Sequence, residues 1–373
     1  MSTTPATLTA VTLGDGLTVS LQGYGGMSLT PVYGPIDPDD ALRTVTHAVD
    51  SGLTFIDTAN VYGNGLSEQT IARLIATRRD EVQLASKFGI LSGGGIGARG
   101  IRGDRAYVFE QIDLSLARLG TDHLDLYYQH RVDPEVPIEE TVGALAELVQ
   151  AGKIRHIGLS EPTGDELRRA VAVHPIAAVQ SEWSIISRDV ERHVIPTAIE
   201  LGVGFVPYSP LGRQWLTGLF DRASLTDGDG RHKFPRFAPE ALAANQPMLD
   251  EVLAVAREAG VSPAQVALAW IYDKGRALGV AVSPIPGSRF IERVDENLAA
   301  AGIRLDAAHV ERLDALADRV VAGRSFNPQW VSAGLRRPRI ATRLPRESAK
   351  SARLGLSIGH FLRSRLTAAS RRP

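Results

Sequence analysis

Short apolar runs alternate with amphipathic helical patterns along most of this sequence. A hairpin comes first, with 9–13 and 17–21 flanking the turn Gly14-Asp15-Gly16, which readily supplies a positive φ. After it, strand-like and helix-like segments follow one another, as in parallel βα units. The strand-like runs lie at residues 53–57, 82–88, 124–129, 154–160, 177–180, 203–208 and 280–285.

A strand near Leu21 brings the count to eight. Eight strands favour a closed (β/α)8 TIM barrel, preceded by the β-hairpin, over an open doubly wound sheet. Capping residues and terminal glycines predict helices that include 39–50, 104–119 and 137–149. In a barrel of this kind, function belongs at the C-terminal ends of the strands.

Two segments fall outside the βα alternation. Residues 213–246 form a polar, Gly- and Pro-containing insertion after the seventh strand, which we interpret as a substrate loop or lid. The other is the C-terminal extension. We therefore expect a barrel domain over 1–335 and a basic, flexible tail over 336–373.

The tail is strongly basic. Ten arginines and Lys350 stand against Glu347 alone, a net charge of +10, which leaves −11 of the overall −1 for the first 335 residues. Its apolar residues fall at helical spacing beside arginines, as a helix on an anionic membrane or partner requires. An extension without a specific partner is the alternative, and nothing in the sequence indicates a specific nucleic acid.

Composition narrows the chemistry. With 44% apolar and 22% charged residues, the chain is typical of a globular protein that buries a large core. The absence of cysteine excludes disulfides, thiolate metal sites and cysteine nucleophiles. Residues 1–10 lack a basic residue before an apolar run, and no stretch has membrane-spanning length, so we expect a cytoplasmic protein.

Four groups that exchange or steer protons end three consecutive predicted strands: Asp57 and Tyr62, then Lys87, then His130. Carbonyl reduction needs an acid that protonates the developing alkoxide. A free tyrosine, with a pKa of about 10, is a weak acid for this purpose. A lysine ammonium lowers a phenol pKa, and an aspartate holds that lysine in place. A histidine beside the phenol polarises the carbonyl. Tyr62 is therefore the predicted proton donor.

These residues resemble the aldo-keto reductase signature. Its motifs occur in family order between about Leu8 and Gly323, and the resemblance implies that Asp57, Tyr62, Lys87 and His130 form the catalytic tetrad. Ser-Glu after the fifth strand and Arg-Asp-Val-Glu after the sixth are similar to the bacterial, fungal and plant single-chain reductases, which are related to potassium-channel β-subunits. The matching motifs are 22–27, 57–63, 152–160, 207–212 and 286–289.

The resemblance also implies a nicotinamide cofactor site, bound without a Rossmann motif. Two arginines and a hydroxyl near a helix start are good phosphate ligands, which favours NADPH over NADH. The substrate would be a small-molecule carbonyl. The implied contacts are Ser160 and Gln180 for the carboxamide, Tyr208 for the nicotinamide ring, Ser209, Leu211 and Gly212 for the pyrophosphate, Ser288, Arg289 and Arg293 for the 2′-phosphate, and Glu296 and Asn297 for the adenine.

Three positions depart from the family pattern. Glu161 stands where many members have Asn, so a carboxamide contact there is in doubt. Gln214-Trp215 replaces a Gly and a smaller apolar residue, so the loop backbone or the pocket is expected to differ. Trp183 stands where Tyr is commoner, and it either lines the pocket or packs.

Other functions compete with this prediction. Residues 95–100 match the dinucleotide fingerprint, but they lie several residues beyond a strand and precede no immediate helix, so we interpret them as a loop. A nucleotide-sensing subunit is the main alternative, because channel β-subunits keep this fold and tetrad. A metal-dependent barrel hydrolase has no evident ligand set in the sequence.

Overall fold

The computed structural model describes residues 9–91 and 100–332. These residues all belong to the first of two compact units, Met1–Arg337. The second unit, Pro338–Pro373, lies outside the described residues, so the predicted character of the basic tail stays a prediction.

Seven parallel strands form one sheet in sequence order, as the alternation predicts. Because parallel strands are covered on both faces, they read as nearly continuous apolar runs. The strands are β3 (Gly23–Gly25), β4 (Phe55–Asp57), β5 (Gln83–Phe88), β6 (Leu124–Gln129), β7 (Ile154–Ser160), β8 (Ala178–Glu182) and β9 (Gly204–Tyr208).

The eighth predicted run, 280–285, is not a regular strand, yet it fills the eighth position of the barrel. The N–H groups of Ser283 and Ile285 donate to β9, and the carbonyls of Pro284 and Pro286 accept from β3. Because proline has no N–H, Pro284 and Pro286 accept hydrogen bonds from β3 but donate none to it. The sheet is thereby closed into a (β/α)8 barrel.

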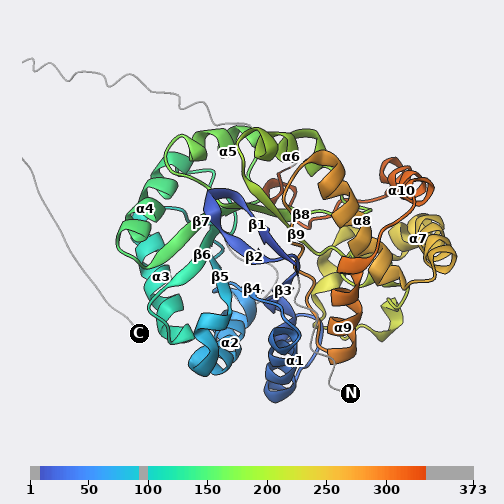
Figure 1. Cartoon of the computed structure of the whole chain (residues 1–373), viewed down its shortest axis with the longest axis horizontal. Helices are drawn as coiled ribbons and strands as arrows, with labels where there is room; N and C mark the ends of the chain where they lie inside the picture. The colour runs from blue at the N-terminus through green and yellow to red at the C-terminus, as the bar shows by residue number, and fades with distance from the viewer. Residues whose placement is uncertain (1–8, 92–99, 333–373) are drawn as a thin grey trace, which may run out of the picture. The chain divides into compact units, whose positions relative to one another are not determined.

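Helices surround the barrel (Figure 1). The sequence predicts that α1 begins at Asp39, whereas the helix begins at Pro38. Its N-cap is Asp37, whose carboxylate accepts from the N–H groups of Asp39 and Asp40. Helix α3 is capped by Asp104 and ends at Gly120, with φ 67°, as expected. The helices are α1 (Pro38–Asp50), α2 (Leu66–Arg78), α3 (Arg105–Leu119), α4 (Ile138–Gln150), α5 (Gly164–Val171), α6 (Val190–Glu200), α7 (Pro239–Ala259), α8 (Pro263–Leu278), α9 (Ile291–Ala299) and α10 (Ala307–Asp314).

The N-terminal hairpin crosses the centre of the barrel in Figure 1. It pairs β1 (Ala10–Thr12) with β2 (Thr18–Ser20), and the N–H of Gly14 donates to the carbonyl of Ala177 at 2.8 Å, just before β8. Leu13 and Leu17 are buried in the same apolar cluster as inward-facing strand residues. The hairpin therefore seals the end of the barrel where the strands begin, and leaves the opposite end for function.

The insertion at 213–246 is more ordered than predicted. It contains four short 3₁₀ turns, and its last eight residues already belong to α7. Pro239, which falls inside the predicted insertion, occupies the first position of the helix, where its missing N–H costs nothing.

Candidate active site

The four predicted catalytic residues meet at one end of the barrel. Asp57 is the last residue of β4, Lys87 lies near the end of β5, and His130 follows β6 directly. Tyr62 begins the 3₁₀ turn after β4. Backbone hydrogen bonds hold the loop ends together, since the N–H of His130 donates to the carbonyl of Phe88 at 2.7 Å. Parallel strands end at the same edge, so the convergence follows from the topology.

Lys87 is the centre of this group. Its side chain is fully buried, and its ammonium forms an ion pair with Asp57. It also donates to the carbonyl of Thr58 at 2.8 Å and to the Tyr62 hydroxyl at 3.4 Å. The His130 ring meets the Tyr62 ring edge-on, with centroids 5.6 Å apart. An unpaired buried ammonium would be very unfavourable, so Asp57 is what allows Lys87 to lie here.

The acid strength of Tyr62 differs from the expectation. Burial raises the pKa of Tyr62 above its ordinary value of 10, and the lowering effect of Lys87 does not outweigh it. Asp57 neutralises the lysine and adds to the rise. Lys87 therefore lowers the pKa of Tyr62 as the sequence predicts, but burial outweighs this effect and the pKa is raised overall.

His130 is held neutral. Burial, together with the charges of Arg131 and Lys87, lowers the pKa of His130 well below its ordinary value of 6.5. Its Nδ1 atom is buried without a hydrogen-bond partner. A neutral imidazole has one N–H to donate, as polarising a carbonyl oxygen requires.

A cavity of about 1020 Å³ opens beside these residues. Asp57, Tyr62 and His130 line it, whereas Lys87 lies behind them. Most of the predicted cofactor contacts line the same cavity: Gln180, Tyr208, Ser209, Leu211, Ser288, Arg289, Arg293, Glu296 and Asn297. Ser160 and Gly212 do not line it.

At the nicotinamide end, only part of the predicted set faces the cavity. Gln180 donates from Nε2 to Asp57 Oδ2 at 2.8 Å. Ser160 is fully buried, and its hydroxyl accepts from Arg131 at 3.0 Å. The guanidinium of Arg131 lies 5.8 Å from the centroid of the Tyr208 ring. Arg131 therefore contacts two of the residues expected to hold the nicotinamide, and the sequence analysis missed it.

The turn after β9 has unusual backbone geometry. Ser209, Arg213 and Gln214 have φ values of 49°, 55° and 83°, in the left-handed region that is unfavourable for residues with a Cβ. Gly212 has a φ of 57°. Trp215 is buried in the core. The expectation that Gln214-Trp215 makes this loop or the pocket differ from the family pattern stays a prediction.

At the adenosine end, the two arginines already have partners. Arg289 donates to the backbone carbonyls of Ser28, Thr30, Tyr33 and Pro35. Arg293 pairs with Glu296 at 2.7 Å. A phosphate here would have to compete with these acceptors.

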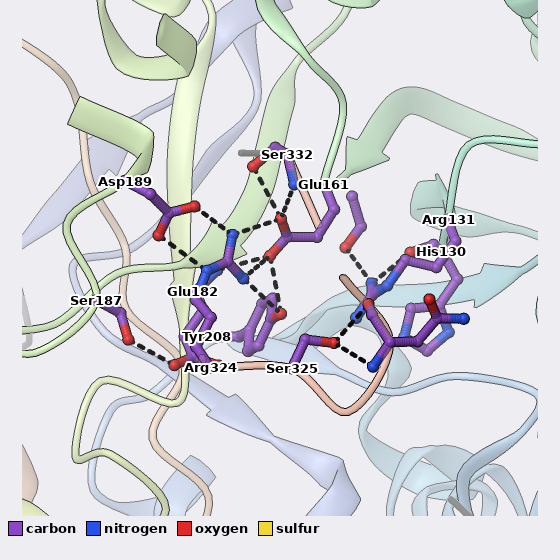
Figure 2. A network of polar contacts seen from close by, with 12 residues as sticks. His130, Arg131, Glu161, Glu182, Ser187, Asp189, Tyr208, Arg324, Ser325 and Ser332 are labelled. Atoms are coloured by element: carbon purple, nitrogen blue, oxygen red, sulfur yellow. Dashed lines mark hydrogen bonds and ion pairs between the residues drawn. The ribbon is translucent and has the colours of Figure 1, made fainter. Parts of the chain in front are cut away.

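Sequence reasoning also missed a buried ionic network at the mouth of the barrel (Figure 2). Arg324 donates to both carboxylate oxygens of Glu161, at 2.8 and 2.9 Å, and to both of Asp189, at 2.9 and 2.8 Å. The Tyr208 hydroxyl donates to Glu161 at 2.8 Å. Burial alone would raise the pKa of Glu161, but the charge and hydrogen bonds of Arg324 hold it well below the ordinary value. The one signal in the sequence was the departure at Glu161.

Trp183 is the last of the three departures from the family pattern. Trp183 packs, since it is fully buried between Phe205 and Trp270. Residues 95–99 lie outside the described residues. Within the described ranges, no cluster of His, Asp and Glu side chains could hold a metal ion. No helix in the part of the chain that the structure covers is long and apolar enough to cross a membrane.

Three solved enzyme structures are similar in fold to this chain. A glycerol dehydrogenase from Gluconobacter oxydans superposes with a TM-score of 0.74 and 26% identity, over 86% of this chain and 98% of that one. An aldo-keto reductase from Bacillus halodurans gives 0.67 and 27%, over 84% and 98%. A thermostable aldo-keto reductase in complex with epalrestat gives 0.66 and 28%, over 83% and 100%.

A family model agrees with these structures. The Aldo/keto reductase family model matches residues 23–318, from the first barrel strand to beyond α10. The match includes Asp57, Tyr62, Lys87 and His130, and every cavity-lining residue named for this cavity except Phe326 and Trp330. This chain belongs to the aldo/keto reductase family.

Proposed function

We propose that this chain reduces an aldehyde or ketone to the alcohol, with NADPH as the hydride source and Tyr62 as the proton donor. The observation that carries the proposal is the buried Lys87–Asp57 pair, which contacts Tyr62 and lies beside His130 at the wall of a large cavity. A paired ammonium behind a phenol, and a neutral imidazole in edge-on contact with it, are the groups that carbonyl reduction needs.

Each residue has a separate task in this proposal. When bound, NADPH would supply hydride to the carbonyl carbon. Tyr62 keeps its proton at neutral pH and gives it to the developing alkoxide, which is a far stronger base than a phenolate. Lys87 stabilises the phenolate that remains, and Asp57 fixes Lys87. His130 donates its single N–H to the carbonyl oxygen and orients the substrate.

The cavity fits an extended dinucleotide. Tyr208 and Tyr62 both line the cavity, and the Ser209–Gly212 turn, with positive φ at both ends, lines it through Ser209, Pro210 and Leu211, where the pyrophosphate would lie. Asn297 and Glu296 would receive the adenine. Arg293 and Arg289 would bind the 2′-phosphate by exchanging their present acceptors for it, which favours NADPH over NADH.

The purified chain with NADPH and a panel of aldehydes and ketones tests the proposal. We expect loss of NADPH absorbance that matches the alcohol formed, and weaker binding of NADH than of NADPH. Tight NADPH binding with no turnover on any carbonyl would instead favour a nucleotide sensor. Failure to bind either nucleotide would contradict the cofactor assignment itself.

A further inference from the structure

Residues 324–332 contribute two aromatic side chains to the cavity wall. Phe326 and Trp330 both line the cavity, and their rings pack against each other with centroids 5.6 Å apart. Phe326 also packs edge-on against Phe234, at 5.4 Å. The middle of the segment has little other support, because Pro328 and Gln329 are exposed.

One carboxylate binds both ends of this segment. Glu161 accepts two hydrogen bonds from Arg324 at its start. It also accepts from the backbone N–H and the hydroxyl of Ser332 at its end, both at 2.8 Å. Both ends are buried, whereas the residues that carry the aromatic rings are only partly so. The segment is therefore fastened at two points to a single side chain.

Glu161 is itself held in an unfavourable conformation. Its φ of 54° is in the left-handed region, which is unfavourable for a residue with a Cβ. Its carboxylate is fully buried, and burying a charge is favourable only with close partners of opposite sign. Arg324 supplies the opposite charge, and its guanidinium is held in turn by Asp189 (Figure 2). Such strain persists only where the surrounding contacts determine it.

We infer that Glu161 is a positioning residue: by holding both ends of residues 324–332, it sets Phe326 and Trp330 as a wall that discriminates substrates by size. The inference rests on the proposed function, because it assigns the wall to the carbonyl-binding part of the cavity. Because Phe326 and Trp330 line the same cavity as Tyr62 and His130, we expect a bulky aromatic carbonyl to reach this wall and to depend on its position. We do not expect a small aliphatic aldehyde to reach it.

The test compares Glu161→Gln with the wild-type chain on naphthaldehyde and propanal, with NADPH. Gln retains an oxygen for Tyr208 but cannot pair with the guanidinium through two carboxylate oxygens. We expect the ratio of KM for naphthaldehyde to KM for propanal to rise about tenfold. Hydrogen exchange of the amides in 324–332 should become faster. Trp330→Ala should raise the KM ratio without changing the network.

Asp125→Asn is the matched control. Asp125 is a buried carboxylate that accepts from Arg79 and from the N–H of Leu84 near the opposite end of the barrel. Its loss should destabilise the fold while leaving the KM ratio and the exchange of 324–332 as in wild type. An equal change in both variants would show a general loss of stability and overturn the inference.

Arg324→Lys provides a second variant, which keeps the charge but loses the two-point pairing and carries the test if Glu161→Gln does not fold. A KM ratio within twofold of wild type in the variants that fold would overturn the inference. If wild type reduces no carbonyl of the whole panel, the proposed function fails instead. Hydrogen exchange then still decides whether Glu161 holds the segment.

Discussion

At the scale of single residues, Tyr62 shows burial and charge acting in opposite directions on one phenol. Lys87 lies 3.4 Å away, yet burial dominates and Asp57 cancels much of the lysine's field. The phenol therefore holds its proton at neutral pH and is a weak acid. Its reactivity depends on the basicity that develops on the substrate oxygen in the transition state.

The pH profile of kcat/KM for carbonyl reduction checks this account. Tyr62, with a raised pKa, keeps its proton up to at least its ordinary value of 10, and His130, with a lowered pKa, stays neutral down to below 6.5. We expect a plateau between about pH 6.5 and 10, because neither group changes its charge there. A fall in rate between about pH 7 and 9 that disappears in Tyr62→Phe would show that the phenol pKa is lowered instead.

Cofactor selectivity is the other residue-scale question, and Arg293 tests it better than Arg289. Arg289→Ala would also release four backbone carbonyls between Ser28 and Pro35, so its effects would be mixed. Arg293 is 45% exposed, and among the residues that the structure describes it forms an ion pair with Glu296 alone. A charge-assisted bond to phosphate is about twice as strong as a neutral one.

We expect Arg293→Ala to raise the Kd for NADPH about tenfold or more and to leave the Kd for NADH within about twofold of the wild-type value. Nucleotide fluorescence titration measures both. Arg276→Ala is the control. Arg276 lies on α8 and not on α9, is similarly exposed, and pairs with Asp273 one turn away on its own helix. Equal losses for the two nucleotides would remove Arg293 from the phosphate site.

At the scale of elements, the strand pattern explains which parts of the fold the sequence predicts. Strands buried on both faces read as apolar runs, and 124–129 and 154–160 match β6 and β7 at both bounds. The run at 280–285 carries Pro284, and Pro286 follows it, so it closes the barrel without becoming a regular strand. The catalytic set was predictable because strand ends are fixed by topology.

The Glu161–Arg324 pair was not predictable in the same way. Its partners are separated by 163 residues, and Arg324 lies in a segment with no periodic pattern. Ion pairs between such segments depend on the route of the chain over the barrel mouth. The sequence shows that Glu161 departs from the Asn of many family members, but it does not show why. The structure shows that Arg324 pairs with it.

Packing inside the barrel gives an element-scale prediction at Gly158. A Cβ on Gly158 would overlap the ring of Tyr128, which is fully buried on the neighbouring strand. We expect Gly158→Ala to lower the free energy of unfolding by about 1–3 kcal/mol. Gly143, inside α4, has no atom near its added Cβ, so Gly143→Ala should raise that free energy by up to about 1 kcal/mol. Urea denaturation measures both, and a neutral Gly158→Ala would contradict the close packing.

At the scale of the whole described barrel, the two ends have different roles. The hairpin seals the end where the strands begin with apolar side chains such as Leu13 and Leu17. The other end concentrates buried charges, among them Lys87, Glu161 and Arg324, around the cavity. Buried ions contribute little net stability, so their concentration at one end indicates function.

The central claim is that Tyr62 donates the proton in a reductase that binds NADPH, and Tyr62→Phe tests it most directly. We expect kcat for carbonyl reduction to fall by about a hundredfold or more, because only the hydroxyl is removed, while the Kd for NADPH stays within about twofold. Tyr272→Phe, which removes a buried hydroxyl bonded to Gln22 away from the cavity, should keep wild-type turnover. A Tyr62→Phe variant with kcat within a few fold of wild type would contradict the account.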